Sequence, residues 1–336
     1  MKTYVWDVRN YVNDLSTYPQ ITEIIQGFKQ DELISIPTET VYGLAANAKS
    51  EAAVSKIYTA KGRPSDNPLI VHIYDQQQLD FVQDIHPSAQ QLMDYFWPGP
   101  ISFILPLKRD SLAPKVTAGK ETVAVRMPND QVARQLLELC GLPLAAPSAN
   151  LSGRPSPTNY HHVYEDLEGR IYGIVRGDDS EIGLESTVLD CSQYPFKIAR
   201  PGAVTETMLN DIVPGCTTAA DYTDEGAPIA PGMKYRHYAP KSPVELIEGG
   251  ITQPYEVAEN IAVVGPKSIE SLIMGGTFYP LCEDEHDFKG AAAHLYEVLR
   301  SIDHNDAISQ IVISGFKRQE QTDALMNRID KASAGK

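Results

Sequence analysis

The chain has 336 residues, of which 42% are hydrophobic, and its formal net charge at pH 7 is −15. The length suits two domains. No apolar run is long enough for a membrane span, and Asp7 and Arg9 interrupt the apolar stretch that a signal peptide would need. We therefore expect a cytoplasmic protein without membrane partners. The acidic charge excludes a protein that attracts nucleic-acid phosphates with its whole surface, so any bound anion must be held by a local group of cations.

Strand-like and helical runs alternate irregularly between about residues 20 and 212. Several strand-like runs follow one another with no helix between them. This favours an α/β (α+β) domain with a mixed, twisted sheet over a purely parallel one. The predicted strands are LISI (33–36), LIVHI (69–73), ISFILPL (101–107), TVAVRM (122–127), LPLAA (142–146), IYGIV (171–175) and STVLD (186–190), and the predicted helices are TEIIQGFKQ (22–30), EAAVSKIYTA (51–60), SAQQLMDYF (88–96) and VARQLLELC (132–140).

The stretch from residue 37 to 73 gathers the hydroxyl, cationic and amide side chains that a phosphorylated ligand would need. The hydroxyls are those of Thr38 and Thr40, in a turn that also contains Glu39, and they are followed by the pair Lys61 and Arg63 and then by Asn67 and His72. The cationic pair follows a helical run that ends at a glycine, so an ordinary charged helix end is the alternative. His72 lies in an apolar predicted strand, where a lone histidine is more often a core residue than a ligand contact.

Four arginines share a proline context. Arg63, Arg154 and Arg200 each directly precede a proline, and one residue separates Arg126 from Pro128. Proline cannot extend a strand or a helix, so each arginine is predicted at the end of an element, where open α/β sheets bind ligands. Arg126 lies in the apolar run TVAVRM, and a buried guanidinium needs an anionic partner. That partner is a structural carboxylate or a bound anion, and four such arginines in one domain favour an anion site.

Hydroxyl residues mark further loops beside predicted strands. Ser148 and Ser156 lie in the segment APSANLSGRPSPT after the run LPLAA, and Ser186 begins the run STVLD. They can donate to phosphate, although serines cap helices more often. No GxxxxGK(S/T) loop or GxGxxG fingerprint is present, so a nucleotide would be held by side chains and strand-end loops. The four scattered cysteines form no CxxC pair, which argues against a zinc site and a disulfide framework.

The chain divides at a polar, Gly- and Pro-rich segment from about residue 217 to 240. Its end, KYRHY (234–238), is either a solvated tether or a lid over the anion site, and its length favours the lid. Beyond it, the runs SPVELIE, NIAVVGP and SQIVISG alternate with two helical runs, which predicts a small doubly wound unit. We therefore divide the chain into a domain at 1–215, a linker at 216–240 and a Rossmann-like domain at 241–336.

The order of these motifs resembles the YrdC-like threonylcarbamoyl-AMP synthases, in their longer two-domain form. The resemblance rests on PTETVYGL, KGRPSDNPLIVHI, WPGPISFIL, VAVRMP, APSANLSGRPSPT, GLESTV and ARPG, and on APGMKYRHYAP in the linker. It covers nearly the whole chain, with Ala45 where relatives commonly have glycine. It implies a sheet with helices around a concave cleft. It also implies a nucleotidyltransferase that condenses L-threonine, bicarbonate and ATP into threonylcarbamoyl-AMP and pyrophosphate, for the N6-threonylcarbamoyladenosine modification of tRNA.

The resemblance implies roles for single residues. Lys61 and Arg63 would be the catalytic cations at the phosphates, and Mg²⁺ would be the cofactor, bound through ATP and by no metal ligands of the protein. The product would pass to a tRNA threonylcarbamoyl-transferase machinery, with no need for this chain to bind tRNA directly. Threonine would be held by Thr40, His72, Arg126, Ala146 and Ser186, and ATP by Arg63, Asn67, Thr122, Ser148, Ser156, Arg200 and Tyr235.

Two other functions fit parts of the sequence. YrdC-like domains have been regarded as having a concave basic face, which would suit double-stranded RNA, but the net charge of −15 counts against it. Hydrogenase-maturation carbamoyltransferases contain a similar domain, but they add paired CxxC zinc motifs and an acylphosphatase-like region that this chain lacks. We expect the synthase and keep the other two as alternatives.

Overall fold

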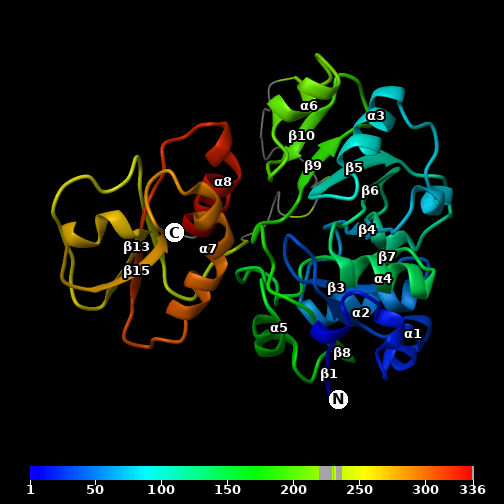
Figure 1. The fold of residues 1–336 in the computed structure, drawn as a ribbon, viewed down its shortest axis with the longest axis horizontal. Helices are drawn as coiled ribbons and strands as arrows, with labels where there is room; N and C mark the ends of the chain where they lie inside the picture. Colours follow the sequence, from blue (N-terminus) through cyan, green and yellow to red (C-terminus); the bar gives the residue numbers. More distant parts are fainter. Residues whose placement is uncertain (219–228, 230, 232–236, 335–336) are drawn as a thin grey trace.

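The computed structural model describes residues 1–218, 229, 231 and 237–334. Figure 1 shows two domains side by side, a larger one formed by the first part of the chain and a smaller one formed by its last third. Most of the predicted linker, Tyr235 included, lies outside the described residues, so the domain boundaries at 215 and 240 stay predictions. In the described ranges no helix has the length and apolar character needed to cross a membrane.

The larger domain is built on a sheet whose neighbouring strands are parallel in some pairs and antiparallel in others, as predicted. All seven predicted strands form, and β1, β3 and β10 are additional. Across the sheet the order is β1 (Tyr4–Asp7), β8 (Gly173–Arg176), β2 (Ile34–Ile36), β3 (Gly43–Asn47), β7 (Leu144–Ala145), β4 (Ile70–His72), β6 (Thr122–Arg126), β5 (Ile101–Pro106), β9 (Thr187–Asp190) and β10 (Lys197–Arg200). The helices are α1 (Ile21–Lys29), α2 (Glu51–Lys61), α3 (Pro87–Phe96), α4 (Gln131–Cys140), α5 (Tyr160–Leu167) and α6 (Glu206–Ile212).

The ends of α2 place two of the predicted cations. Ser50 caps its first turn by accepting a hydrogen bond from the Ala53 amide at 3.2 Å. Gly62 ends the helix in the left-handed conformation, with φ of 62°, which glycine adopts at low cost. The predicted helix end is therefore confirmed. Lys61 is the last helical residue, and Arg63 follows the terminating Gly62.

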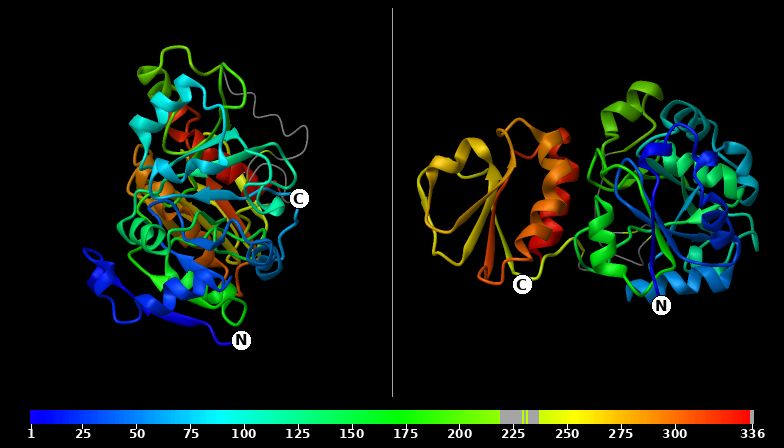
Figure 2. Two further views of the ribbon diagram at one scale, coloured as in Figure 1. Left: turned by 90° about the vertical axis from the view of Figure 1, so that its right-hand side faces the viewer. Right: turned by 60° about the horizontal axis from the view of Figure 1, so that its bottom comes forward.

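The smaller domain is a four-stranded, fully parallel sheet with two helices, which confirms the predicted small α/β unit. The right-hand view of Figure 2 shows both helices between this sheet and the larger domain. The strand order is β11 (Val244–Ile247), β16 (Gln310–Ser314), β13 (Ile261–Pro266) and β15 (Thr277–Cys282), the helices are α7 (Phe288–Ile302) and α8 (Asp323–Ser333), and a separate pair is formed by β12 (Tyr255–Glu256) and β14 (Ile273–Met274).

The two domains share a continuous apolar contact. Val41 and Leu184 of the larger domain, together with Tyr238 of the linker, belong to the hydrophobic core cluster of the smaller domain. Gly183 lies so close to α7 that a β-carbon there would be 2.5 Å from the Ala293 α-carbon, and its φ is +77°. Only glycine fits both demands, so the loop before β9 lies directly against helix α7.

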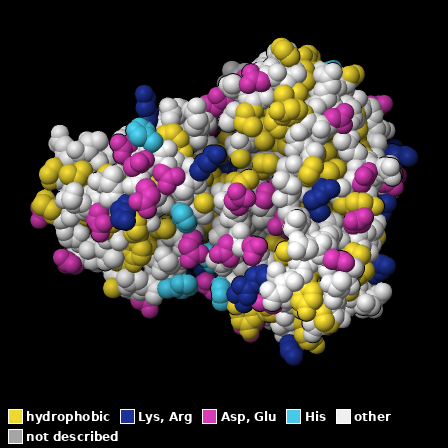
Figure 3. Space-filling model, viewed as in Figure 1, with side chains coloured by type: hydrophobic (Ala, Val, Ile, Leu, Met, Phe, Trp, Pro, Cys, Tyr) yellow, Lys and Arg dark blue, Asp and Glu magenta, His cyan; other side chains and the backbone are white. Residues whose placement is uncertain are grey.

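Acidic side chains are spread over the face shown in Figure 3, with several near the junction of the domains. This distribution agrees with the net charge of −15. A site for an anionic ligand therefore has to be sought among buried cations rather than on this surface.

Candidate active site

A cavity opens where several strand ends of the large sheet meet the linker. Its volume is about 560 Å³ when the solvent-filled space at its opening is included. His72 ends β4 and Arg126 ends the parallel strand β6, and the two residues are direct partners in the ladder. Arg200 ends β10, and Ser186 directly precedes β9. Polar residues that line the cavity are Thr38, Thr40, Arg63, His72, Arg126, Ser148, Glu185, Ser186, Arg200, His237 and Tyr238.

Arg126 has the carboxylate partner that its burial required. Its Nη1 donates to Thr40 Oγ1 at 2.7 Å and its Nε to the Gly99 carbonyl at 3.2 Å. Its Nη2 lies 2.6 Å from Glu39 Oε1, but this contact lacks hydrogen-bond geometry, and both carboxylate oxygens are buried with no hydrogen-bond donor among the described residues. The contact is thus an ion pair with unused hydrogen-bonding capacity on both sides, beside the cavity.

His72 is neutral in the folded protein. Burial, and then the charge of Arg126, lower the pKa of His72 from 6.5 to about 3. Its Nδ1 lies 3.2 Å from the Ile70 carbonyl oxygen, which can only accept, so the ring carries its proton on Nδ1. Nε2 is left as a hydrogen-bond acceptor that a substrate hydroxyl or amine can donate to.

This burial predicts a pH dependence of stability. Below pH 6.5 the unfolded chain protonates His72 and the folded protein does not, so stability falls as the pH falls from 6.5 toward about 3. The contribution is about 1.4 kcal/mol per pH unit. Urea unfolding at pH 7, 6 and 5 should therefore show a wild-type advantage over His72→Gln that shrinks as the pH is lowered. A difference that stays constant with pH would mean that His72 has the same pKa in the folded and the unfolded protein.

Arg63 and Arg200 line the cavity without a counter-ion among the residues that the structure describes. Arg63 Nη2 donates to the Pro68 carbonyl at 2.9 Å, and Arg200 donates to the Ser186 carbonyl, the Ser186 hydroxyl and the Pro231 carbonyl. Burial is the main cause that lowers the pKa of Arg63 to about 10 and that of Arg200 below its ordinary value. Two desolvated guanidiniums bonded only to neutral oxygens form a site for an anion such as phosphate.

Other predicted site residues lie away from this cavity. Lys61 is buried and its Nζ donates to the Ser148 and Asn150 carbonyls at 2.5 and 2.6 Å, while burial lowers its pKa well below the ordinary value. Ser156 donates to the Glu185 carboxylate. The assigned roles of these residues stay predictions, because Lys61, Asn67, Thr122 and Ser156 do not line the cavity and Tyr235 is outside the described residues.

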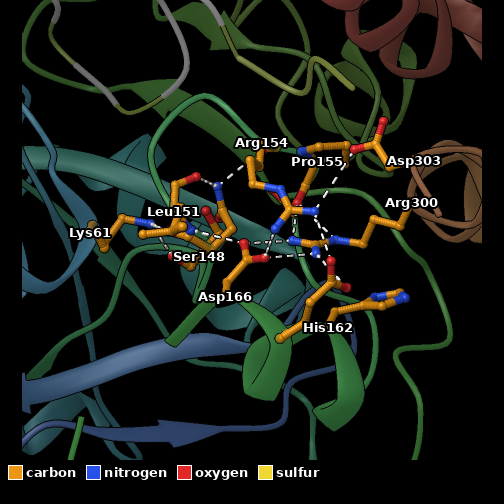
Figure 4. A network of polar contacts seen from close by, with 12 residues as sticks. Lys61, Ser148, Leu151, Arg154, Pro155, His162, Asp166, Arg300 and Asp303 are labelled. Carbon is orange, nitrogen blue, oxygen red and sulfur yellow. Dashed lines mark hydrogen bonds and ion pairs between the residues drawn. The ribbon is translucent and has the colours of Figure 1, made fainter. Parts of the chain in front are cut away.

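The interpretation of Arg154 as part of an anion site is wrong. Its guanidinium lies 3.0 Å from Glu165, forms a closer pair with Asp166 and lies 3.8 Å from Asp303. Figure 4 shows this network, in which Arg300 of α7 also binds both oxygens of Asp166, at 3.0 and 2.9 Å. Arg154 is therefore a structural cation between the domains, and its proline context does not distinguish it from the three arginines that line the cavity.

Three residues that the structure places at the site were not among the predicted ligand contacts. Glu39 pairs with Arg126, and Glu185 and His237 line the cavity. Glu39 and Glu185 lie within the motifs PTETVYGL and GLESTV, beside the residues that were assigned. Their charge was the available signal: a carboxylate next to a predicted buried arginine is a candidate partner.

Comparison with known proteins identifies the family to which this fold belongs. Residues 26–202 match the family model Sua5_yciO_yrdC, described as "Telomere recombination", and residues 204–334 match "Threonylcarbamoyl-AMP synthase, C-terminal domain". A threonylcarbamoyl-AMP synthase of Bacillus subtilis is 44% identical over 345 residues, which cover 100% of this chain and 99% of the relative. One of Schizosaccharomyces pombe is 34% identical, with 90% and 85% covered. The crystal structure of P. abyssi Sua5 complexed with L-threonine superposes with a TM-score of 0.86 at 34% identity and covers 99% of this chain and 98% of that one.

The mixed sheet and its guanidinium-lined cavity define a YrdC-like enzyme of the nucleotidyltransferase type. The matches to both domains make the assignment specific. The chain belongs to the threonylcarbamoyl-AMP synthase family, in its two-domain Sua5 form.

Proposed function

We propose that this protein joins L-threonine, bicarbonate and ATP into threonylcarbamoyl-AMP and pyrophosphate, for the threonylcarbamoyladenosine modification of tRNA. The observation that carries the proposal is the division of charge in one cavity. Arg126 faces the carboxylate of Glu39, whereas Arg63 and Arg200 have only neutral partners among the described residues. One part of the cavity thus suits an amino acid, and the other suits phosphate.

On the amino-acid side, Arg126 binds the carboxylate of threonine. The neighbouring hydroxyls of Thr40 and Ser186 and the free Nε2 of His72 satisfy the polar groups of the substrate, and Ala146 packs against it. Arg126 Nη2 makes no hydrogen bond to Glu39 among the described residues. The carboxylate of a bound amino acid can accept this missing hydrogen bond. Threonine in the crystal structure of the P. abyssi relative supports this assignment.

On the nucleotide side, Arg63, Arg200 and Ser148 bind ATP. Among the described residues no group of three His, Cys, Asp or Glu side chains could hold a metal, and the cavity-lining carboxylate, Glu185, has its oxygens occupied by hydrogen bonds. These residues fit a site in which the ATP phosphates, and not the protein, carry Mg²⁺. The ion would neutralise part of the phosphate charge. Asn67, Thr122, Ser156 and Tyr235, with Lys61 at the phosphates, complete the proposed set.

The reaction proceeds by two bond-forming steps. The deprotonated threonine amine adds to CO₂, or to bicarbonate with loss of water, and gives a carbamate. A carbamate oxygen then displaces pyrophosphate from the α-phosphorus of ATP. Arg63 and Arg200 stabilise the negative charge that develops on the phosphates, and the rest of the cavity orients both substrates.

The linker supports a protected reaction space. Pro231, His237 and Tyr238 line the cavity, and Tyr238 stacks on Tyr296 of the smaller domain with ring centroids 5.5 Å apart. Carbamates and acyl phosphates hydrolyse in water, so a linker that covers the site has a clear purpose. The reaction uses ATP and serves tRNA, so we place it in the cytoplasm, with the product passed to a separate transferase.

Pyrophosphate release tests the proposed function. The protein is incubated with ATP, Mg²⁺, bicarbonate and one amino acid at a time, and the product is identified by mass spectrometry. We expect pyrophosphate with threonine, together with threonylcarbamoyl-AMP, and no release when bicarbonate is omitted. Release that does not depend on an amino acid, or that needs carbamoyl phosphate, would contradict the proposal.

A further inference from the structure

We propose that the smaller domain is a working part of the active site, through Arg328 of helix α8. Arg328 is a positioning residue: it holds the Glu185 carboxylate away from the cavity arginines and so keeps them free for the ATP phosphates. This inference rests on the proposed function, because that function assigns Arg63 and Arg200 to ATP.

Arg328 binds the larger domain through one fully buried guanidinium. Its Nε donates to Glu185 Oε2 at 3.0 Å, its Nη2 to the Glu185 carbonyl at 3.1 Å and its Nη1 to the Pro201 carbonyl at 2.7 Å. Glu185 directly precedes Ser186, and Pro201 directly follows Arg200. A single side chain of the smaller domain thus holds the residues next to two predicted ligand contacts.

Three side chains among the described residues donate hydrogen bonds to the Glu185 carboxylate. Besides Arg328, Tyr296 of α7 donates to it at 2.9 and 3.2 Å, and Ser156 donates to Oε1. Two of these three partners come from the smaller domain. Burial is the largest single influence and would raise the pKa of Glu185, but the charges of Arg328 and Arg200 and the hydrogen bond from Ser156 together lower that pKa, so the carboxylate stays ionised.

An ionised carboxylate in this cavity is a competitor for ATP. Glu185 lines the same cavity as Arg63 and Arg200, and no ion pair joins it to either one within the described residues. Without Arg328, the nearest cations left to Glu185 would be the arginines that bind the phosphates. A Glu185–Arg200 pair would then have to be broken each time ATP binds, which weakens binding.

The contact is built to be rigid. Gly183, two residues before Glu185, lies against the backbone of α7, and Leu184 packs into the core of the smaller domain. A second buried arginine, Arg300 of α7, donates to the Pro155 carbonyl next to Ser156 at 2.7 Å. Residues of α7 and α8 thus bind Glu185, and α7 also binds the backbone next to its partner Ser156.

Equilibrium binding of a non-hydrolysable ATP analogue to the full-length protein tests this role. Arg328→Met should weaken binding by about tenfold or more, because a buried charge-assisted interaction is lost and a competitor is released. The KM for threonine, measured in the pyrophosphate assay, should change by less than about threefold. Arg318→Met is the matched control: this half-exposed arginine of the same domain pairs with Glu248 and Asp330, and we expect unchanged binding.

The double variant Arg328→Met, Glu185→Gln separates positioning from stability. Glutamine carries no charge to compete for the arginines, so the affinity for the analogue should return to within about threefold of wild type. All measurements are made at a temperature where circular dichroism shows each variant folded, and the uncharged, polar variant Arg328→Gln replaces the methionine variant if that one does not fold. Unchanged binding by the single variant, or a double variant as weak as the single one, would overturn the inference. If the wild type itself fails to bind the analogue, the proposed function fails instead.

Discussion

Replacement of Arg126 by methionine is expected to raise the KM for threonine by about 100-fold or more. Removal of one partner from a buried, hydrogen-bonded charge pair costs about 3–5 kcal/mol, and each 1.4 kcal/mol is a factor of ten in affinity. Arg126 is 4% exposed and donates to Thr40 and Gly99, which fix its guanidinium where we propose that the carboxylate of threonine binds. Threonine-dependent pyrophosphate release over a range of threonine concentrations checks the prediction.

One further variant shows whether the effect is specific. Arg126→Met leaves Glu39 as a buried carboxylate without its ion-pair partner, so the variant should also lose stability. Adding Glu39→Gln should recover much of the thermal stability and leave the KM for threonine high. Binding of an ATP analogue without threonine should change little in either variant. A double variant with a normal KM would mean that Arg126 serves only to neutralise Glu39.

Replacement of Arg63 by alanine is expected to abolish measurable turnover, with a loss of about 1,000-fold or more in kcat/KM. The removal of one donor that stabilises transition-state charge costs about 100- to 1,000-fold, and Arg63 is also predicted to bind ATP. Arg63 is bonded only to the Asn67 and Pro68 carbonyls among the described residues, so its loss strands no carboxylate and should spare the fold.

A matched arginine defines the background for this variant. The Arg109 side chain is 95% exposed and lies in the same domain, beside Asp110. Arg109→Ala should therefore turn over at the wild-type rate. Threonine binding without ATP, measured by calorimetry, should persist in Arg63→Ala. Near-normal pyrophosphate release by Arg63→Ala would remove this residue from the chemistry.

Strong strand preferences explain two of the predicted strands, and packing explains two of the missed ones, β3 and β10. LIVHI and TVAVRM are rich in β-branched residues, and both form strands. β3 has the sequence GLAAN, whose residues favour strands weakly, and it exists because β2 and β7 pair with it on both sides. β10 carries the charged ends Lys197 and Arg200 and pairs only with β9 in the described sheet. Long-range partners of this kind leave no local pattern to read.

The site could be predicted one residue at a time, but its charge pairing could not. The proline context found Arg63, Arg126 and Arg200, and all three line the cavity. The same context also selected Arg154, which pairs with acidic residues of both domains. Some arginines meet carboxylates from distant parts of the chain, as Arg328 meets Glu185 across 143 residues. Spacing along the chain carries no information about such pairs.

The strand order of the large sheet has a consequence for synthesis on the ribosome. β8 lies between β1 and β2, so Tyr4 finds its ladder partner only once Gly173 has been made. At the usual elongation rate, the first strand waits on the order of ten seconds for that partner. The cavity is completed later still, because Arg200 and Tyr238 follow in the chain. The nascent chain must therefore keep its N-terminal strand from pairing elsewhere, and catalytic competence arises only near the end of translation.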